Sequence, residues 1–336
     1  MKALICSEPG YLIYDEFELP EQKPGYTLLK VKCIGVCGTD IHAFEGTQPY
    51  FSYPRVLGHE IAGEIVETSH NEFKKGDFVT IIPYFNCGEC QACKSSKGNC
   101  CVSLEVFGVH TDGGMREYIA VPNSCLIAAE GLKLSEMAMI EPYSIAKHGI
   151  KRAALKNGEC AVIVGAGPIG IAAATFANLT GAKVLVLDVN KERLDVCKSI
   201  LPTVETWTAN EGDILEKVSE FTAGIMANVL IDASGNLNAI NSSFKFLAHA
   251  GRYLLIGLQS GNISFSHPEF HKREATLLSS RNASKYDFEE VIAHIRNREI
   301  DVNKIITHRI PFLELGDRFP ELLNLENKVL KAVVEF

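Results

Sequence analysis

The fold is decided by one glycine-rich stretch, Gly165-Ala166-Gly167-Pro168-Ile169-Gly170. An apolar run at 160–164 precedes it and predicts a buried strand, and a helix-like stretch follows it to about residue 180. Asp188 closes the next predicted strand, 18 residues after Gly170. A G-x-G-x-x-G turn between a strand and a helix, with an acid after the following strand, is the fingerprint of dinucleotide binding.

This context gives each part of the stretch a role in binding a dinucleotide. The first glycine permits a tight turn, the second lets the pyrophosphate approach the backbone, and the third allows close packing of helix on strand. The start of the helix then meets the phosphates. Asp188 would accept hydrogen bonds from the adenosine ribose and repel a 2′-phosphate, so we expect NAD rather than NADP; a glycine-rich turn without a ligand is the alternative. The candidate cofactor-binding residues are Gly165, Gly167, Pro168, Ile169, Gly170, Asp188, Arg193 and Arg281.

Residues from 145 onward continue the pattern around this stretch. Apolar runs alternate with helix-like stretches, and this order predicts a parallel, doubly wound α/β sheet of the Rossmann type. We assign 145–284 to this NAD-binding domain. The further strands expected in it lie at 183–187, 228–231 and 252–256.

The first part of the chain has a different pattern. Residues 1–144 are rich in Gly, Pro and short alternating runs, such as 28–33 and 78–82, and long helical patterns are scarce. These features predict a β-rich barrel or sandwich. We expect the last segment, 285–336, to return to this domain, because it holds a helical stretch at 288–296 and a strand-like run at 329–336.

Length and charge limit the functions that the chain can have. Its 336 residues fit about two domains, and its net charge is −8. An acidic protein lacks the positive field that nucleic acids and membrane surfaces attract, so neither is expected as a partner. No apolar run reaches the roughly 18 residues of a membrane span, and residues 1–10 lack the apolar region of a signal peptide.

Cysteine usage favours metal binding over disulfides. The chain has eleven cysteines, an odd number, and five of them fall between Cys87 and Cys101. A secreted disulfide scaffold is shorter and usually has an even number. Clustered cysteines in a protein without a signal peptide indicate a metal site and a cytoplasmic location.

The pattern Cys87-x2-Cys90-x2-Cys93-x7-Cys101 predicts a structural zinc site. Four thiolates close a tetrahedral shell and leave no position for water. Cys100 competes with Cys101 for the fourth place, and spacing alone does not separate them. A redox pair and an iron–sulfur cluster are the alternatives; the cluster is disfavoured because the ferredoxin run continues with x3-Cys-Pro, and the gap here is longer.

A second group of metal-ligand residues lies far from this loop in the sequence. It comprises Cys37-Gly38-Thr39-Asp40-Ile41-His42 and Gly58-His59-Glu60. A thiolate, an imidazole and a carboxylate together suit a catalytic zinc. Taken singly, Cys37 is more often a small buried residue, and His59 a satisfied polar one. Glu141 adds a carboxylate at the junction of the two domains, where a helix-start acid before a proline is the alternative.

Together these motifs, in this order, resemble the zinc-dependent medium-chain dehydrogenases over essentially the whole chain. The sorbitol and sugar-acid branch is most similar, since Glu60 directly follows His59 and Glu141 stands where the alcohol dehydrogenases carry a cysteine. The resemblance implies a GroES-like catalytic domain built from both chain ends, with the Rossmann domain inserted between them. It also implies a homodimer or homotetramer.

The resemblance further implies a metal site with an open position for substrate. Zinc is expected on Cys37, His59 and either Glu60 or Glu141, where it makes a bound hydroxyl easier to deprotonate. One thiolate and one carboxylate neutralise Zn²⁺. We therefore expect one acid to bind directly and the other to exchange with water or substrate.

The proton and hydride routes also follow from the resemblance. The substrate's carbinol carbon delivers hydride to NAD. Thr39 takes the proton, the nicotinamide ribose passes it on, and His42 releases it to water. A hydroxyl and a neutral imidazole suit such a relay because each can donate and accept a proton.

The expected substrate is a sugar acid, an open-chain hexonate oxidised at a secondary hydroxyl. A buried carboxylate needs a fixed cation, and an arginine can hold it through two hydrogen bonds. The candidate cations are Arg55, the 271–273 group and Arg281. The alternatives are a polyol or threonine as substrate, a zinc-ribbon nucleic-acid or partner-binding module, and a catalytically silent regulator that binds NAD and zinc.

Overall fold

The computed structural model describes residues 1–21, 23–49 and 51–336. The chain divides into two compact units: unit 1 is Met1–Glu141 with Ser284–Phe336, and unit 2 is Pro142–Ala283. Unit 1 therefore contains both ends of the chain. The first division falls in the first turn of helix α4 (Ile140–Arg152).

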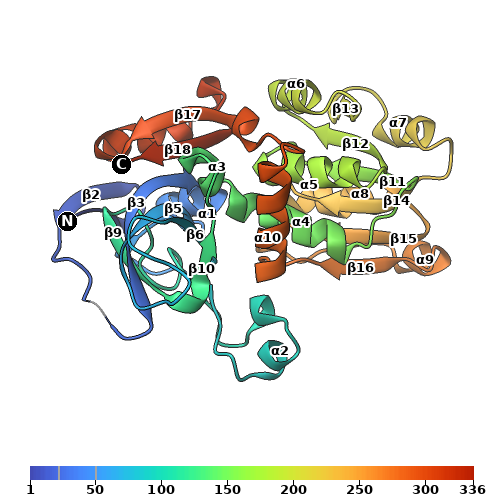
Figure 1. Cartoon of the computed structure of the whole chain (residues 1–336). Helices are drawn as coiled ribbons and strands as arrows, with labels where there is room; N and C mark the ends of the chain where they lie inside the picture. The colour runs from blue at the N-terminus through green and yellow to red at the C-terminus, as the bar shows by residue number, and fades with distance from the viewer. Residues whose placement is uncertain (22, 50) are drawn as a thin grey trace. The chain divides into compact units, whose positions relative to one another are not determined.

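Unit 1 consists mainly of strands, with short helices between them (Figure 1). Its strands are β1 (Lys2–Glu8), β2 (Tyr11–Glu16), β3 (Tyr26–Val36), β4 (Arg55–Val56), β5 (Glu60–Thr68), β6 (Phe78–Ile81), β7 (Tyr84–Phe85), β8 (Glu105–Val106), β9 (Tyr118–Pro122), β10 (Leu126–Ala128), β17 (Ile306–Pro311) and β18 (Lys331–Glu335). Its helices are α1 (Gly38–Glu45), α2 (Gln91–Lys94), α3 (Leu134–Ala138), α10 (Lys285–Arg296) and α11 (Leu315–Arg318).

Unit 2 alternates strands and helices. Its strands are β11 (Cys160–Val164), β12 (Lys183–Asp188), β13 (Glu205–Thr208), β14 (Ala227–Asp232), β15 (Leu247–Leu255) and β16 (Thr276–Ser279). Its helices after α4 are α5 (Pro168–Leu179), α6 (Lys191–Ile200), α7 (Ile214–Phe221), α8 (Leu237–Ser243) and α9 (His267–Lys272).

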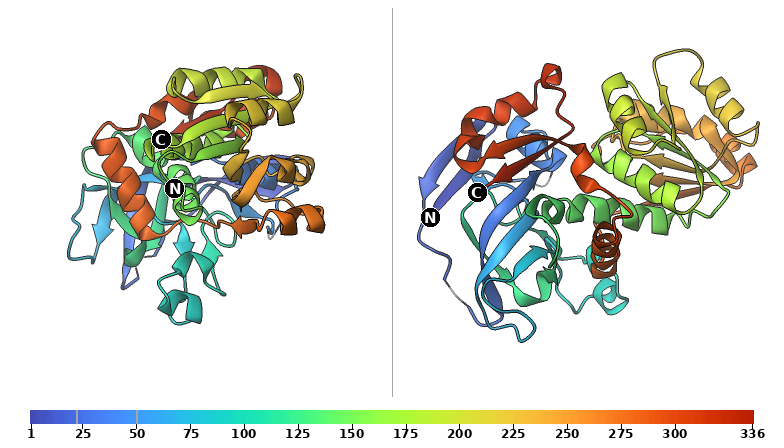
Figure 2. Two further views of the ribbon diagram at one scale, coloured as in Figure 1. Left: turned by 90° about the vertical axis from the view of Figure 1, so that its right-hand side faces the viewer. Right: turned by 45° about the horizontal axis from the view of Figure 1, so that its top comes forward.

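The strands of unit 2 form one parallel sheet, in the order β13-β12-β11-β14-β15-β16. Helices lie on both faces of this sheet (Figure 2). Because both faces are covered, β11 and β12 are almost continuously buried, and their Val, Ile and Leu residues do not alternate with polar ones. The doubly wound parallel sheet expected from the sequence is confirmed.

The main sheet of unit 1 joins the two ends of the chain. Its strand order is β10-β6-β5-β3-β18-β17, and β9 also pairs with β3. The long strand β3 is central because it pairs with β5, β9 and β18. The antiparallel pairing of β18 with residues 33–36 of β3 brings the C-terminal segment into unit 1.

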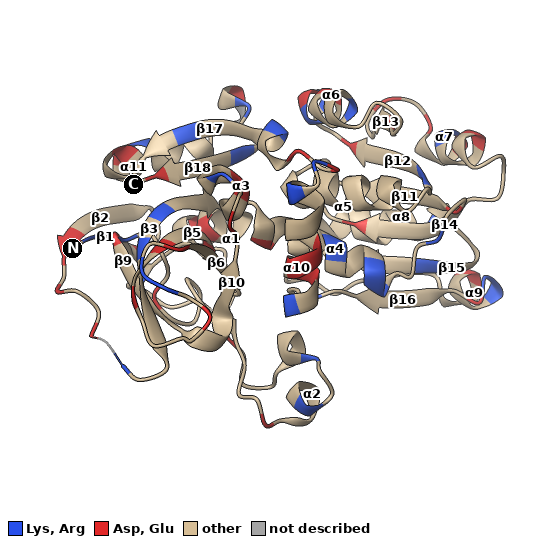
Figure 3. Ribbon diagram, in the orientation of Figure 1, with Lys and Arg blue, Asp and Glu red and all other residues tan. Residues whose placement is uncertain are grey.

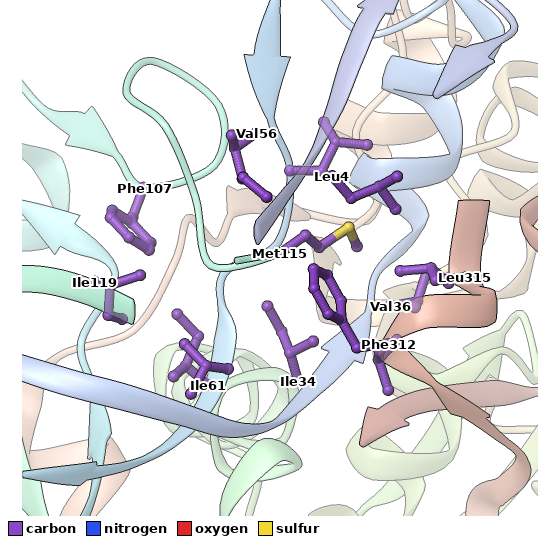
Figure 4. Packing of buried hydrophobic residues seen from close by; sticks show 14 of the residues in the cluster. Leu4, Ile34, Val36, Val56, Ile61, Phe107, Met115, Ile119, Phe312 and Leu315 are labelled. Carbon is purple, nitrogen blue, oxygen red and sulfur yellow. The ribbon is translucent and has the colours of Figure 1, made fainter. Parts of the chain in front are cut away.

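The core of unit 1 draws side chains from widely separated segments. Figure 4 shows Leu4, Ile34, Met115 and Phe312 packed in one cluster, and each is at most 4% exposed. Burying a side chain of this size stabilises a fold by about 1.5–3 kcal/mol. The site described below therefore rests on a core that needs both chain ends. In the part of the chain that the structure describes, no helix is both long and apolar enough to cross a membrane.

Candidate active site

The structure brings Cys37, His59 and Glu60 together in unit 1. One possible ligand atom from each lies within 4.8 Å of those of the other two. Cys37 is the N-cap of α1, directly after β3, and Glu60 is the first residue of the neighbouring strand β5. Glu141 is not part of this compact group. The spacing favours Glu60 over Glu141 as the third ligand.

The carboxylate of Asp40 ties the two ligand-bearing segments together. Its Oδ2 accepts a hydrogen bond from the Cys37 N–H at 2.8 Å, and its Oδ1 accepts one from the Gly58 N–H at 3.0 Å. Burial raises the pKa of Asp40, while the charge of His59 and the two backbone donors oppose this rise. Sequence reasoning gave Asp40 no role, although it lies inside the motif that begins at Cys37.

A glycine opposite Glu60 makes room for its carboxylate. Gly35 of β3 pairs with Glu60 of β5 across the sheet. A Cβ atom at Gly35 would lie 1.8 Å from Oε2 of Glu60, which is far shorter than any non-bonded contact. Position 35 therefore accepts only glycine while Glu60 keeps this orientation.

Glu60 forms a buried ion pair with Lys331, 271 residues away in the sequence. Lys331 Nζ donates to Oε1 at 2.6 Å and lies 2.5 Å from Oε2, so both carboxylate oxygens face the ammonium group. The side chains are 3% and 0% exposed. Burial lowers the pKa of Lys331, but the charge of Glu60, followed by those of Cys37 and Glu141, outweighs burial and raises it. Each charge needs the other, because an unpaired buried charge is very costly.

Lys331 is the main residue of this site that sequence reasoning missed. It is the single charged residue in the apolar run 329–334 of the final strand. Lysine is almost never fully buried unless it is paired, so a lysine in such a run was the available signal. Its partner was not predictable without knowing that β18 pairs with β3.

Glu141 lies in the first turn of α4 and is also buried. The hydroxyl of Tyr84 donates a hydrogen bond to its Oε1, while its Oε2 has no hydrogen-bond partner. Burial raises the pKa of Glu141 to about 7; the charge of Glu60 adds to this rise, and His59, Tyr84 and Lys331 oppose it. Glu141 is thus both a helix-start acid and a buried carboxylate whose charge interacts with the ligand group.

The residues around His59 fit a bound metal ion. Burial lowers the pKa of His59, but the hydrogen bond and charge of Cys37, with the charges of Asp40 and Glu141, raise it well above its ordinary value. Its Nδ1 is buried without a hydrogen-bond partner, as is Oε2 of Glu141. Buried polar atoms are rarely left without partners. A thiolate, an imidazole and a carboxylate are the donor set of a catalytic zinc, so the residues present fit this metal.

Thr39 and His42 lie nearly one turn apart on α1. Oγ1 of Thr39 is 3.8 Å from Sγ of Cys37, so this hydroxyl borders the ligand group. His42 is exposed, with Nδ1 3.0 Å from Oγ1 of Thr47 and 3.6 Å from the carboxylate of Glu45. The helix therefore carries a hydroxyl beside the ligands and an imidazole in contact with solvent.

The four-cysteine loop also fits zinc. The sulfur atoms of Cys87, Cys90, Cys93 and Cys101 lie 3.4–4.0 Å apart in the closest pairs. These separations are too long for disulfides, but they match the roughly 3.8 Å expected between sulfurs of a tetrahedral zinc site. Backbone N–H groups of Cys93 and Val102 lower the pKa of Cys90 to about 6, which favours the thiolate form that binds metal.

Cys100 and Cys101, the two candidates for the fourth ligand, have different environments in the structure. Cys101 is buried, and its Sγ lies 3.4 Å from that of Cys87. Cys100 is exposed and does not belong to the four-sulfur group. The geometry favours Cys101 as the fourth ligand.

In unit 2 the glycine-rich stretch forms the turn from β11 to α5. Gly165 has φ +107°, a conformation that side chains disfavour. A Cβ atom at Gly170 would lie 1.9 Å from the Gly165 carbonyl oxygen, whereas one at Gly167 would meet no atom within 4 Å. Gly167 is the N-cap of α5 and Pro168 its first residue. The open space at Gly167 leaves the helix N-terminus accessible to a phosphate.

Asp188 ends β12 beside this turn. Its Oδ2 accepts a hydrogen bond from the Ala166 N–H at 2.5 Å, and its Oδ1 accepts one from the Asn190 N–H at 2.8 Å. Carboxylate oxygens have further lone pairs, so Asp188 keeps acceptor capacity for a ribose. Arg193 lies near the start of α6, and Arg281 is exposed just after β16.

Two of the cations expected to bind a substrate carboxylate, Arg55 and Arg273, have local partners. Arg55 donates to Oγ of Ser52 at 2.9 Å and lies 3.5 Å from Asp112, while its Nε is buried without a hydrogen-bond partner. Arg273 pairs with Glu269 at 2.5 Å within unit 2. Figure 3 shows acidic and basic residues interspersed over the elements of both units.

Comparison with known proteins places the chain in a family. Residues 23–131 match the alcohol dehydrogenase GroES-like domain, and residues 168–297 match the zinc-binding dehydrogenase model. L-galactonate-5-dehydrogenase of Escherichia coli K12 is 40% identical over 340 residues, which cover 100% of this chain and 99% of that protein. The chain belongs to the zinc-binding alcohol dehydrogenase family. The expected family, fold class and enzyme class, an oxidoreductase, are thereby confirmed.

Two further similarities bear on function. Sorbitol dehydrogenase of Halalkalibacterium halodurans is 32% identical over 322 residues, covering 94% of each chain. A crystal structure of an alcohol dehydrogenase (rspB) from Escherichia coli CFT073, complexed with NADH, superposes with a TM-score of 0.93 at 29% identity. The superposition covers 100% of this chain and 99% of the rspB chain.

Proposed function

We propose that the chain is a zinc- and NAD-dependent dehydrogenase of a sugar acid, which oxidises L-galactonate or a close epimer at carbon 5. The observation that carries the proposal is the compact group of Cys37, His59 and Glu60, with ligand atoms within 4.8 Å of one another and with His59 and Glu60 buried. The 40% identity to L-galactonate-5-dehydrogenase supports the substrate class. The four-cysteine loop would hold a second, structural zinc.

The residues of unit 1 would divide the chemistry among them. Cys37, His59 and Glu60 would hold the catalytic zinc, which polarises the substrate hydroxyl when bound. Thr39 holds a proton at Oγ1 beside this group, 3.8 Å from the Cys37 sulfur. His42, exposed on the same helix, exchanges protons with water. Both side chains suit these roles because each donates and accepts protons.

NAD is the proposed cofactor of unit 2, held by the glycine-rich turn, Asp188, Arg193 and Arg281. The NADH complex of the relative at 29% identity supports this choice. Replacing Asp188→Ala should relax the preference for NAD over NADP, measured as the ratio of kcat/KM values, because the carboxylate that repels a 2′-phosphate is lost. Asp195→Ala, an exposed acid on α6, is the control. Equal efficiency of the unmodified protein with both cofactors would refute the proposal.

The substrate test compares sugar acids with neutral polyols. NADH formation is measured at equal concentrations of L-galactonate, L-gulonate, L-idonate, sorbitol and galactitol. We expect L-galactonate or a close epimer to have the highest kcat/KM. We expect Arg55→Gln to raise KM for the sugar acid but not for a polyol, since Nε of Arg55 is a buried donor without a partner.

A polyol dehydrogenase is the second candidate, and the 32% identity to a sorbitol dehydrogenase favours it. A clear preference for sorbitol, galactitol or threonine in the same assay would select this branch. It would also show that the argument from the substrate carboxylate is wrong.

We also propose a homodimer or homotetramer in the cytoplasm. Among the described residues, β16 is the last strand of the six-stranded sheet, with Leu277 37% exposed, and such edges are available for pairing between chains. Light scattering of the purified protein tests the assembly; a monomer at micromolar concentration would contradict it.

A further inference from the structure

The side chain of Tyr84 lies in a fully enclosed position next to Glu141. Tyr84 is 4% exposed and Glu141 is 2% exposed. Tyr84 belongs to the short strand β7, and its ring lies edge-on to Phe288 of α10, with centroids 6.3 Å apart at 79°. Packing therefore fixes the ring, and its hydroxyl points to one atom, Oε1 of Glu141.

The two oxygens of Glu141 have different surroundings. Oε1 accepts the hydrogen bond from Tyr84, whereas Oε2 is buried without a hydrogen-bond partner. His59, Glu60 and Lys331 all act on the charge of this carboxylate. The carboxylate thus has one buried oxygen without a hydrogen-bond partner, and its charge interacts with His59 and Glu60 of the proposed ligand group. The hydroxyl of Tyr84 determines which oxygen this is.

Glu60 and Glu141 are held by different kinds of partner. Glu60 is fixed by the full charge of Lys331, 2.5 Å from Oε2. Glu141 instead accepts a hydrogen bond from the neutral hydroxyl of Tyr84. A carboxylate held this way can approach a metal, a water or a substrate hydroxyl through Oε2 alone.

We propose that Tyr84 is a positioning residue that orients Glu141 so that only Oε2 faces the catalytic zinc and its bound water or substrate. This inference rests on the proposed catalytic zinc site, and no sequence motif predicted it. Groups that orient metal-site carboxylates typically contribute about 10- to 100-fold to metal affinity or activity. The hydroxyl of Tyr84 should contribute within this range.

The test replaces the hydroxyl without changing the ring. Tyr84→Phe keeps the packing against Phe288 and releases Oε1 of Glu141. Tyr253→Phe is the matched control, because Tyr253 is also buried and donates to the Ile240 carbonyl at 3.3 Å, inside unit 2. Zinc is replaced by cobalt, and the visible spectrum of the Cys37 site is obtained as the difference from a Cys37→Ser protein.

We expect Tyr84→Phe to change the cobalt spectrum and to lower kcat by about 10-fold or more, while Tyr253→Phe changes neither. In a Glu141→Gln background, Tyr84→Phe should alter kcat less than twofold, because its effect passes through Glu141. An unchanged cobalt spectrum together with kcat within twofold of the unmodified protein would overturn the inference. Equal effects with and without the Glu141 substitution would overturn it too.

The outcomes also separate this inference from the proposed function. If the unmodified protein shows no cobalt spectrum that depends on Cys37, the catalytic zinc site itself is wrong. If that spectrum is present and Tyr84→Phe leaves it unchanged, only the role of Tyr84 is wrong. Should Tyr84→Phe fail to fold, Glu141→Gln alone provides the test. A changed cobalt spectrum and a lowered kcat support the inference, whereas an unchanged spectrum with unchanged kcat overturns it, because Tyr84 would then orient a carboxylate that has no role at the metal.

Discussion

The four-cysteine loop and the Cys37–His59–Glu60 group both offer a zinc site, but they are assembled in different ways. The loop takes its ligands from one local segment, 87–101, and Cys87 lies exposed on it. The second group takes its ligands from the β3–α1 turn and the start of β5, and Lys331 of β18 holds it. The loop depends on local chain geometry, whereas the second group depends on the sheet. The two sites should therefore fail in different ways.

The largest effect is expected from Cys37→Ser. It should lower kcat at least about 1,000-fold, because a bound metal supplies several kcal/mol of charge stabilisation. The Tm should change little, since the surrounding sheet remains. Cys90→Ser should do the reverse and lower the Tm, because a closed metal site contributes directly to folding. Metal analysis should give two zinc ions per unmodified chain and one in each variant.

Cys33→Ala is the control for this comparison. Cys33 is a buried thiol on β3, the strand that ends just before Cys37. It belongs to neither group of possible metal ligands. This variant should keep both zinc ions and its turnover. A single zinc in the unmodified protein, or an iron-linked visible absorbance, would contradict the assignment of two zinc sites.

The second effect concerns the ion pair that fixes the sheet-dependent site. Lys331→Met should cost about 3–5 kcal/mol in the free energy of unfolding, because it leaves the buried carboxylate of Glu60 without a cation. Lys331→Met combined with Glu60→Gln should recover part of this loss, since the unpaired charge is gone. Denaturant titration measures both. A loss below about 1 kcal/mol for Lys331→Met would show that the charge is compensated in another way.

The same contrast explains what the sequence could predict. The spacing from Cys87 to Cys101 and the turn from Gly165 to Gly170 are local patterns, and their chemistry can be recognised before the fold is known. The short apolar and alternating runs also predicted strands, and β3, β6, β11 and β12 lie where those strands were expected. These patterns are local because each depends on neighbouring residues.

The partners of Glu60 and Glu141 are not local. Lys331 reaches Glu60 only because β18 pairs with β3, and Tyr84 reaches Glu141 across 57 positions of the chain. A lysine in an apolar strand was a visible signal, but no sequence feature pointed to Tyr84. The periodicity of apolar residues predicts which side chains are buried. It does not predict which residues from distant segments of the chain will contact one another.

A third, smaller effect should appear in the pH dependence of stability. Burial raises the pKa of Glu141 from 4.5 to about 7, so the folded state favours its neutral form. The protonated form of Glu141 contributes on the order of 3 kcal/mol to the free energy of unfolding at pH values below its ordinary pKa. This contribution is lost as the pH rises from the ordinary pKa to about 7. The measurement uses Cys37→Ser protein, which keeps only the zinc of the four-cysteine loop. Adding Glu141→Gln should flatten the loss of stability between pH 5 and about 7; an equal slope in both proteins would contradict this.

The smallest effect distinguishes Cys100 from Cys101 within the loop. Cys101 is buried with its sulfur 3.4 Å from that of Cys87, whereas Cys100 is exposed and outside the four-sulfur group. Cys100→Ser should keep both zinc ions and shift the Tm by less than about 2 °C, because this exposed thiol is not one of the proposed zinc ligands. Cys101→Ser should lose one zinc and lower the Tm, while turnover by the remaining folded protein persists. If Cys100→Ser loses zinc instead, Cys100 is the fourth ligand, and the zinc-bound loop does not have the geometry of the Cys87–Cys90–Cys93–Cys101 group.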